Sequence, residues 1–237
     1  MWLLKSSLRL IGLWLFFMLG YAEASAQHQP VLSQYMLNSL PLNPAFSGSR
    51  ESMSFAASYR NQWTGFDGAP TTSTFAVHSP LRKESFALGM VVHRDELGVS
   101  RTSGFQFVAA YRMRLGNGKL SFGLSGGMTQ TKNNWSEIIT TEDADIAFSS
   151  GDQVNWNPDF GTGLYYYNQK YYVSLSVPTL IKASYVNGDG YVASFQPSAS
   201  NFYLNSGMNI NVNSSWQFKP SFMLRYHRDS AFAVDFN

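Results

Sequence analysis

The sequence predicts an all-β protein: an antiparallel transmembrane β-barrel of a bacterial outer membrane, with about ten strands in this chain. Three observations lead to this prediction: alternating apolar and polar residues, an N-terminal leader, and a composition poor in charge. Charged residues make up 14% and aromatic residues 16% of the 237 residues, whereas about 25% of residues are charged in soluble domains. Few charges and many aromatic rings are typical of a wall that faces lipid.

Residues 1–26 have the features of a cleavable signal peptide. Lys5 and Arg9 precede an apolar run over residues 10–19, and Ala24-Ser25-Ala26 offers the small residues that a signal peptidase accepts. The run is shorter than the roughly 20 residues of a spanning helix, which favours cleavage after Ala26 over a retained anchor. The chain contains no cysteine, so neither a lipid-modified cysteine nor a disulfide is available.

From residue 52 onward, residues alternate as in strands with one face toward lipid and the other toward water. One predicted lipid face carries Phe105, Phe107, Ala109, Tyr111 and Met113. Leu88 lies on another lipid face and Ser121 on a lumen face, so we expect arginine to cost roughly 2–4 kcal/mol at Leu88 and much less at Ser121. A soluble periplasmic sandwich also alternates and is the alternative fold. Strands are expected at 52–62, 71–79, 86–94, 103–115, 119–130, 159–167, 171–177, 201–212, 216–227 and 231–237.

The connections between these strands differ in length. Gly116-Asn117-Gly118, Asn168-Gln169-Lys170 and Asn213-Ser214-Ser215 are typical of tight hairpin turns, because Asn and Gly tolerate positive φ. Two long segments, 131–158 and 178–200, fall between them. Outer-membrane barrels have short periplasmic turns and long outer loops, so we expect both long segments to face outward.

Two ordered blocks of residues follow the leader. The first is Ser33-Gln34-Tyr35-Met36-Leu37-Asn38 with Asn43-Pro44-Ala45-Phe46-Ser47-Gly48. The second is Tyr59-Arg60-Asn61-Gln62-Trp63 with Asp67-Gly68-Ala69-Pro70 and, further on, His78. In this order and spacing they resemble the PorP/SprF family of the Bacteroidota, and looser matches extend the resemblance over most of the mature chain.

The resemblance implies a function in protein export. It implies a non-enzymatic outer-membrane component of the type IX secretion or gliding motility machinery, which supports secretion or surface attachment of a client adhesin. The implied partners are the periplasmic ring, the outer-membrane translocon and a secreted adhesin or cargo domain, with outer-membrane lipid around the wall. A net charge of +2 gives no argument for nucleic acid. A small porin or solute channel is the alternative, because an inner face of Ser, Gly, Thr and Asn suits it equally.

The candidate partner-binding or family-motif residues fall mainly in two segments. Residues 27–51 are expected to form a periplasmic extension or a luminal plug, in which Tyr35, Asn43 and Pro44 contact a partner; a simple lead-in to the first strand is the equal alternative. Residues 60–70 are expected to anchor a strand end at the membrane interface, where Gly68 and Pro70 bend the loop, or to form a docking surface. The candidates are Gln34, Tyr35, Asn43, Pro44, Arg60, Gln62, Trp63, Gly68, Ala69, Pro70 and His78.

We predict no catalytic residue, no cofactor and no metal site. His78 and His93 occupy inward positions on neighbouring strands, which suggests a Ser-His lipase, but such an enzyme would carry its nucleophile and base on the lipid-facing wall. Glu142, Asp143 and Asp145 could bind Ca²⁺. They lack a full ligand spacing, which favours a solvated acidic loop.

Residues 52–237 are assigned to the barrel. Members of the resembled family usually continue for several more strands, so we expect a fragment or a shortened paralogue. A complete ten-stranded barrel is the alternative, because the strand number is even. An unpaired strand edge in lipid costs several kcal/mol for each unsatisfied backbone group.

Overall fold

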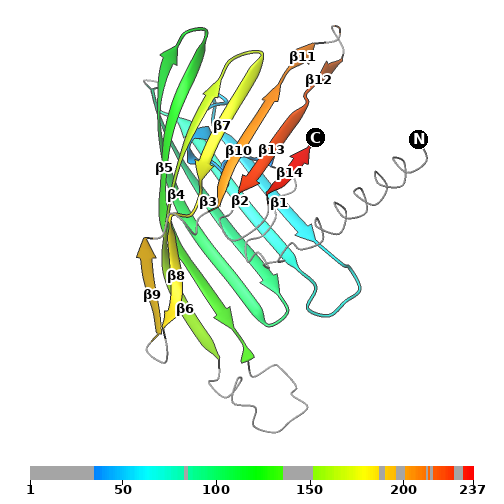
Figure 1. Cartoon of the computed structure of the whole chain (residues 1–237), viewed down its shortest axis with the longest axis vertical. Coiled ribbons are helices and arrows are strands. Elements are labelled where there is room, and N and C mark those ends of the chain that lie inside the picture. The colour runs from blue at the N-terminus through cyan, green and yellow to red at the C-terminus, as the bar shows by residue number, and fades with distance from the viewer. Residues whose placement is uncertain are drawn as a thin grey trace, which may run out of the picture.

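The computed structural model describes residues 35–82, 85–135, 152–186, 190–195, 201–211, 213, 216–226 and 232–237. Ten antiparallel strands form one sheet in the order β1-β2-β3-β4-β5-β6-β7-β10-β13-β14 (Figure 1). These strands are β1 (Ser54–Asn61), β2 (Thr71–Pro80), β3 (Phe86–Leu97), β4 (Ser100–Leu115), β5 (Gly118–Asn133), β6 (Gln153–Tyr167), β7 (Tyr171–Val177), β10 (Phe202–Met208), β13 (Ser221–Tyr226) and β14 (Ala233–Phe236). The prediction of an all-β antiparallel fold with ten strands is confirmed.

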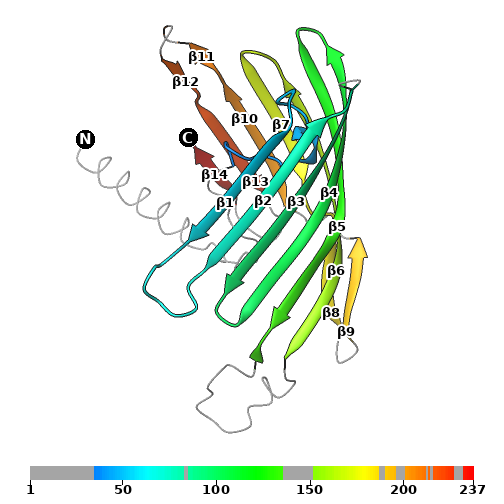
Figure 2. The same ribbon diagram turned by 180° about the vertical axis from the view of Figure 1, so that it is seen from behind.

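The sheet curls around a concave side, as Figures 1 and 2 show from opposite directions. Strands β1 and β14 are its two ends, and no ladder joins them among the residues described. The sheet is therefore open here, with the strand arrangement of a β-barrel. None of the helices in the described ranges is long and apolar enough to cross a bilayer.

The two faces of the sheet reverse the pattern of a soluble protein. Phe107 and Leu124 are 62% and 66% exposed, whereas the side chains of Arg112 and Ser121 are buried. The convex outer face is thus apolar and the concave inner face is polar, as in a wall surrounded by lipid. Along β4 the apolar outer positions run from Phe105 to Met113, which matches the roughly 9–11 residues of a transmembrane strand.

Ser121 differs from its prediction in one respect. It lies on the inner face as expected, but its exposed fraction is 0%. An arginine there would have no water to enter, so the expected tolerance of arginine at Ser121 is wrong.

Several connections also differ from the prediction. The turns after β4 and β6 are as short as expected, but the link predicted over residues 95–102 is wrong. Strands β3 and β4 continue to Leu97 and Ser100, leaving a two-residue turn in which Gly98 has φ +56°. Arg94 donates to Glu96 here over 2.6 Å. Charged residues such as these interrupt the alternation of apolar and polar residues. The predicted strands therefore end before the observed strands do.

The predicted long loops are partly strands. β5 and β6 extend to Asn133 and Gln153, and the segment after β7 contains a separate hairpin of β8 (Ile181–Val186) and β9 (Gly190–Phe195). The predicted strand 201–212 is interrupted at Asn209, after which β11 (Ile210–Asn211) pairs with β12 (Gln217–Phe218). We call the end of the sheet with the turns after β4 and β6 the turn end, and the opposite end the loop end (Figure 1).

Candidate functional site

The chain before β1 lies inside the curl of the sheet, drawn in blue in Figures 1 and 2. We call residues 35–50 the inner segment. Its single helical turn, η1 (Pro44–Phe46), contacts β4, β5 and β6. The segment covers the inner face with its own buried side chains, which are Tyr35, Leu40, Asn43, Pro44, Ala45 and Ser47.

Glycines in the strands make room for this segment. A Cβ atom on Gly123 would lie 2.0 Å from the backbone nitrogen of Ala45, and one on Gly163 would lie 2.0 Å from Oδ1 of Asn43. On β3, a Cβ at Gly89 would meet the Ser47 hydroxyl at 3.3 Å. Glycine within a strand often marks a close approach of another backbone. These positions form a track on which the inner segment rests directly against the sheet.

Asn43 is the central anchor of the inner segment. Its side-chain amide donates to the Leu164 carbonyl at 2.9 Å and contacts the Ser174 hydroxyl at 2.7 Å. Its Oδ1 accepts the Ala45 backbone N–H at 2.8 Å and so caps η1. One buried side chain therefore both starts the helical turn and joins it to β6 and β7.

We expect Asn43→Ala to lower the free energy of unfolding by about 1–3 kcal/mol, because it leaves buried hydrogen-bonding groups without a partner. The urea midpoint of the protein in detergent micelles measures this change. Asn61→Ala is the matched control, since Asn61 is exposed at the end of β1. Equal midpoints for the two variants would contradict the role of Asn43 as an anchor.

Gly48 fixes the far end of the inner segment. Its backbone N–H donates to Nδ1 of His78 at 2.9 Å, and its carbonyl accepts from Arg112. Its φ is +71°, and a Cβ would lie 2.5 Å from the Cβ of Ala87, so both conformation and space require glycine. Because Nδ1 of His78 accepts a hydrogen bond, the ring is neutral and carries its proton on Nε2.

Two further contacts hold the margins of the segment. Lys119 forms an ion pair with Glu51 next to the turn end, and the hydrogen bond and charge of Lys119 lower the pKa of Glu51. At the other margin, Asn237 donates to the Tyr35 hydroxyl at 2.6 Å. Tyr35 also packs against Tyr203 and Met223. The inner segment thus touches both early and late strands of the sheet.

The second group of candidates lies in the loop between β1 and β2. The backbone N–H of Gln62 donates to the Pro70 carbonyl at 3.0 Å, which closes the loop. Gly68 has φ +74°, and its carbonyl accepts from Gly98 of the β3–β4 turn at 2.8 Å. Gly68 and Pro70 therefore fix the loop backbone against its neighbour.

The tip of the same loop carries exposed aromatic rings. Trp63 and Phe66 are 70% and 78% exposed, and Trp63 has a positive φ of 53°. Ala69 closes the tip by donating its backbone N–H to the Phe66 carbonyl. Arg60 is half-buried on the inner side of β1, opposite Thr72.

The structure thus separates the predicted residues into two places. Tyr35, Asn43, Pro44 and His78 meet at the inner segment, whereas the residues of the 60–70 block lie at the loop end, and Gln34 is outside the described residues. Sequence reasoning missed the glycine track and Arg112. Glycines on strand positions were the available signal for a close backbone approach.

The inner face gives no support to the lipase alternative. Nδ1 of His78 already accepts a backbone N–H, and Gln106 donates to the buried Asp159 at 2.5 Å. Within the described ranges no cluster of three or more His, Asp or Glu residues could hold a metal ion. Glu142, Asp143 and Asp145 fall outside those ranges.

The fold and the inner segment define a membrane protein whose β-sheet wall is apolar outside and covered by its own chain inside. The sequence model of the type IX secretion system membrane protein PorP/SprF family matches residues 24–237. The chain belongs to this family, and the resemblance noted in the sequence is confirmed. No curated protein and no solved structure matches it. Membership of this family makes the chain a membrane component of the type IX secretion system. The family is not known as enzymatic.

Proposed function

We propose that this chain is a non-enzymatic outer-membrane component of type IX secretion that supports the secretion or surface attachment of a client adhesin. It works beside the periplasmic ring and the outer-membrane translocon. The observation that carries the proposal is the inner segment, which Asn43 and Gly48 bind to the wall through buried hydrogen bonds. A sheet whose inner face is covered in this way fits a protein that supports other secretion components better than it fits a solute pore.

The porin alternative makes a different prediction for conductance. A channel needs an open lumen, whereas η1 packs on three successive strands of this sheet. In a planar bilayer we expect no steady large pore. A stable open conductance that persists at all voltages would favour the porin.

The exposed loop is the proposed contact surface for partners. Tyr35, Asn43 and Pro44 are buried within the chain, so we assign them to supporting the fold. Trp63 and Phe66 extend into solvent or the membrane interface from a loop whose backbone is fixed by Gly68. Rigid exposed aromatic residues provide large contact area with little loss of conformational entropy.

Deleting the gene is expected to stop one large exported protein from reaching the cell surface while general outer-membrane permeability stays intact. Surface proteomics of the mutant, with uptake of a small dye as the permeability readout, measures both effects. A strain with normal secretion and gliding but lost uptake of a small solute would exclude the proposed function.

We expect the double variant Trp63→Ala, Phe66→Ala to insert normally but not to restore secretion in the deletion strain. Phe107→Ala is the matched control, because Phe107 is an exposed aromatic residue on the outer face of β4. If the double variant restores secretion, the loop is not the contact surface for partners.

The proposed outer-membrane location also predicts an orientation. With the loop end outside, a cysteine at Thr64 should react with an impermeant maleimide on whole cells, and one at Asn117 should not. Both positions are exposed, and the chain has no native cysteine. Labelling at Asn117 alone would show that the turn end, and not the loop end, faces outward.

A further inference from the structure

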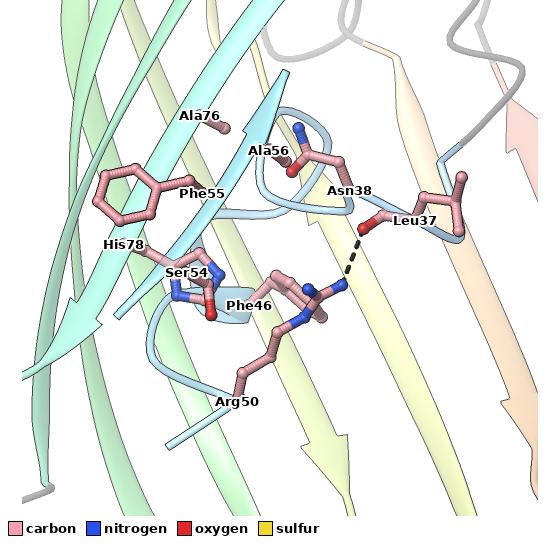
Figure 3. A pocket seen from close by; sticks show the side chains of 9 residues that line it. All are labelled: Leu37, Asn38, Phe46, Arg50, Ser54, Phe55, Ala56, Ala76 and His78. Atoms are coloured by element: carbon pink, nitrogen blue, oxygen red, sulfur yellow. Dashed lines mark hydrogen bonds between the residues drawn. The ribbon is translucent and has the colours of Figure 1, made fainter. Parts of the chain in front are cut away.

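A small pocket lies between the inner segment and strands β1 and β2 (Figure 3). Phe46 and Ala76 supply apolar lining, while Asn38, Arg50, Ser54 and His78 supply polar atoms. The enclosed space is about that of one water molecule, with an open side. Its size excludes a large substrate but admits a single small chemical group.

The polar groups of the pocket are hydrogen-bond donors. Nδ1 of His78 accepts the Gly48 N–H at 2.9 Å, which leaves the proton on Nε2. His78 is only 5% exposed, and within the described residues its Nε2 forms no hydrogen bond. The Asn38 amide can donate as well, whereas the Ser54 hydroxyl donates to the Ser52 carbonyl at 3.4 Å.

Arg50 adds a positive charge that forms no ion pair with a carboxylate of the described residues. One of its guanidinium nitrogens donates to the Leu37 carbonyl at 2.9 Å (Figure 3). The acidic residue next to it in sequence, Glu51, is paired with Lys119. Among the ion pairs of the described residues none includes Arg50.

A second guanidinium increases the positive potential. Arg112 contacts the Gly48 carbonyl, and its Cζ would lie 3.1 Å from a Cβ on Gly48. Convergent donors and positive charge around a small space fit one negatively charged, planar acceptor group.

We propose that this pocket binds a single carboxylate group, supplied by a free small carboxylic acid or by an acidic side chain of a bound peptide. Arg50 forms the charge-assisted hydrogen bond, since guanidinium matches carboxylate geometry. The Nε2–H of His78 donates a second hydrogen bond to the one carboxylate oxygen that fills the water-sized space, and the carbon atoms stay at its open side. The Asn38 amide supplies a further donor.

The test is an NMR titration of the full chain in detergent micelles at constant ionic strength. The probes are sodium acetate, sodium chloride, inorganic phosphate, and the amidated tripeptides Gly-Gly-Glu and Gly-Gly-Gln. The readout is the resonance of the His78 Nε2–H, which the variants below retain. We expect saturable shifts with acetate and with Gly-Gly-Glu, and none with chloride or Gly-Gly-Gln.

Three variants test the assignment. Arg50→Gln keeps a donor for the Leu37 carbonyl but removes the charge, and we expect it to weaken acetate binding about tenfold or more. Asn38→Ala should weaken acetate binding less than Arg50→Gln does. Arg101→Gln is the matched control, because Arg101 is an exposed arginine at the loop end and should leave binding unchanged.

The outcomes separate the two sources of the carboxylate. Tighter binding of Gly-Gly-Glu than of acetate identifies a peptide side chain, and the reverse identifies a free acid; either result supports the site. Equal shifts with chloride, tighter binding of phosphate than of acetate, or unchanged binding in Arg50→Gln would overturn the proposal.

Discussion

Gly123→Ala is expected to prevent the inner segment from docking, although it adds only one methyl group. The new Cβ would lie 2.0 Å from the backbone nitrogen of Ala45 and 2.3 Å from the carbonyl carbon of Pro44. Backbone atoms held by Asn43 cannot move aside as a flexible side chain would. We expect a loss of about 3 kcal/mol in the free energy of unfolding, the upper part of the range for overpacking.

Limited chymotrypsin digestion measures docking separately from stability. Tyr35 is buried in the parent protein, so cleavage there should become fast only in the variant. Gly126→Ala is the matched control on the same strand, since its Cβ would meet only the Phe160 ring at 3.5 Å. Equal protection in both variants would show that the glycine track does not position the segment.

The second large loss of stability is expected for Leu88→Arg. Leu88 is more than half exposed on the outer face, and in lipid a charge near the midplane costs roughly 2–4 kcal/mol. Ser58→Arg is the comparison, because Ser58 is exposed on the inner side of β1; we expect it to cost less than about 1 kcal/mol. Urea unfolding from lipid vesicles gives both free energies.

The same pair of variants separates the membrane protein from the soluble sandwich. In a soluble protein an exposed leucine is replaced by arginine at little cost. A neutral Leu88→Arg, together with recovery of the protein without detergent, would therefore contradict the lipid-facing wall.

The strands could be predicted because their signal is local. Alternation along 103–115 needs only neighbouring residues, and the turn at Gly116-Asn117 is encoded by the residues that form it. Strand ends were predicted less well. Between Arg94 and Ser103 most residues are polar or charged, so the alternation disappears while the hydrogen-bonded ladder continues to Leu97 and Ser100.

The candidate site could be predicted only in part, because its contacts are not local. The family motif drew attention to Tyr35, Asn43 and His78, but a position outside the strands suggested a surface role for the first two. Burial depends on the groups that Asn43 meets on β6 and β7, and on Tyr203 and Met223 around Tyr35. No pattern within residues 27–51 specifies those distant partners.

The sequence separation of these contacts has a kinetic consequence. Asn43 meets partners 121 and 131 residues further along the chain, so its hydrogen bonds to the sheet form only once β6 and β7 are in place. Contacts of high sequence separation form slowly. Until then η1 can pack only on β4 and β5, so we expect the inner segment to complete its docking among the last steps of assembly.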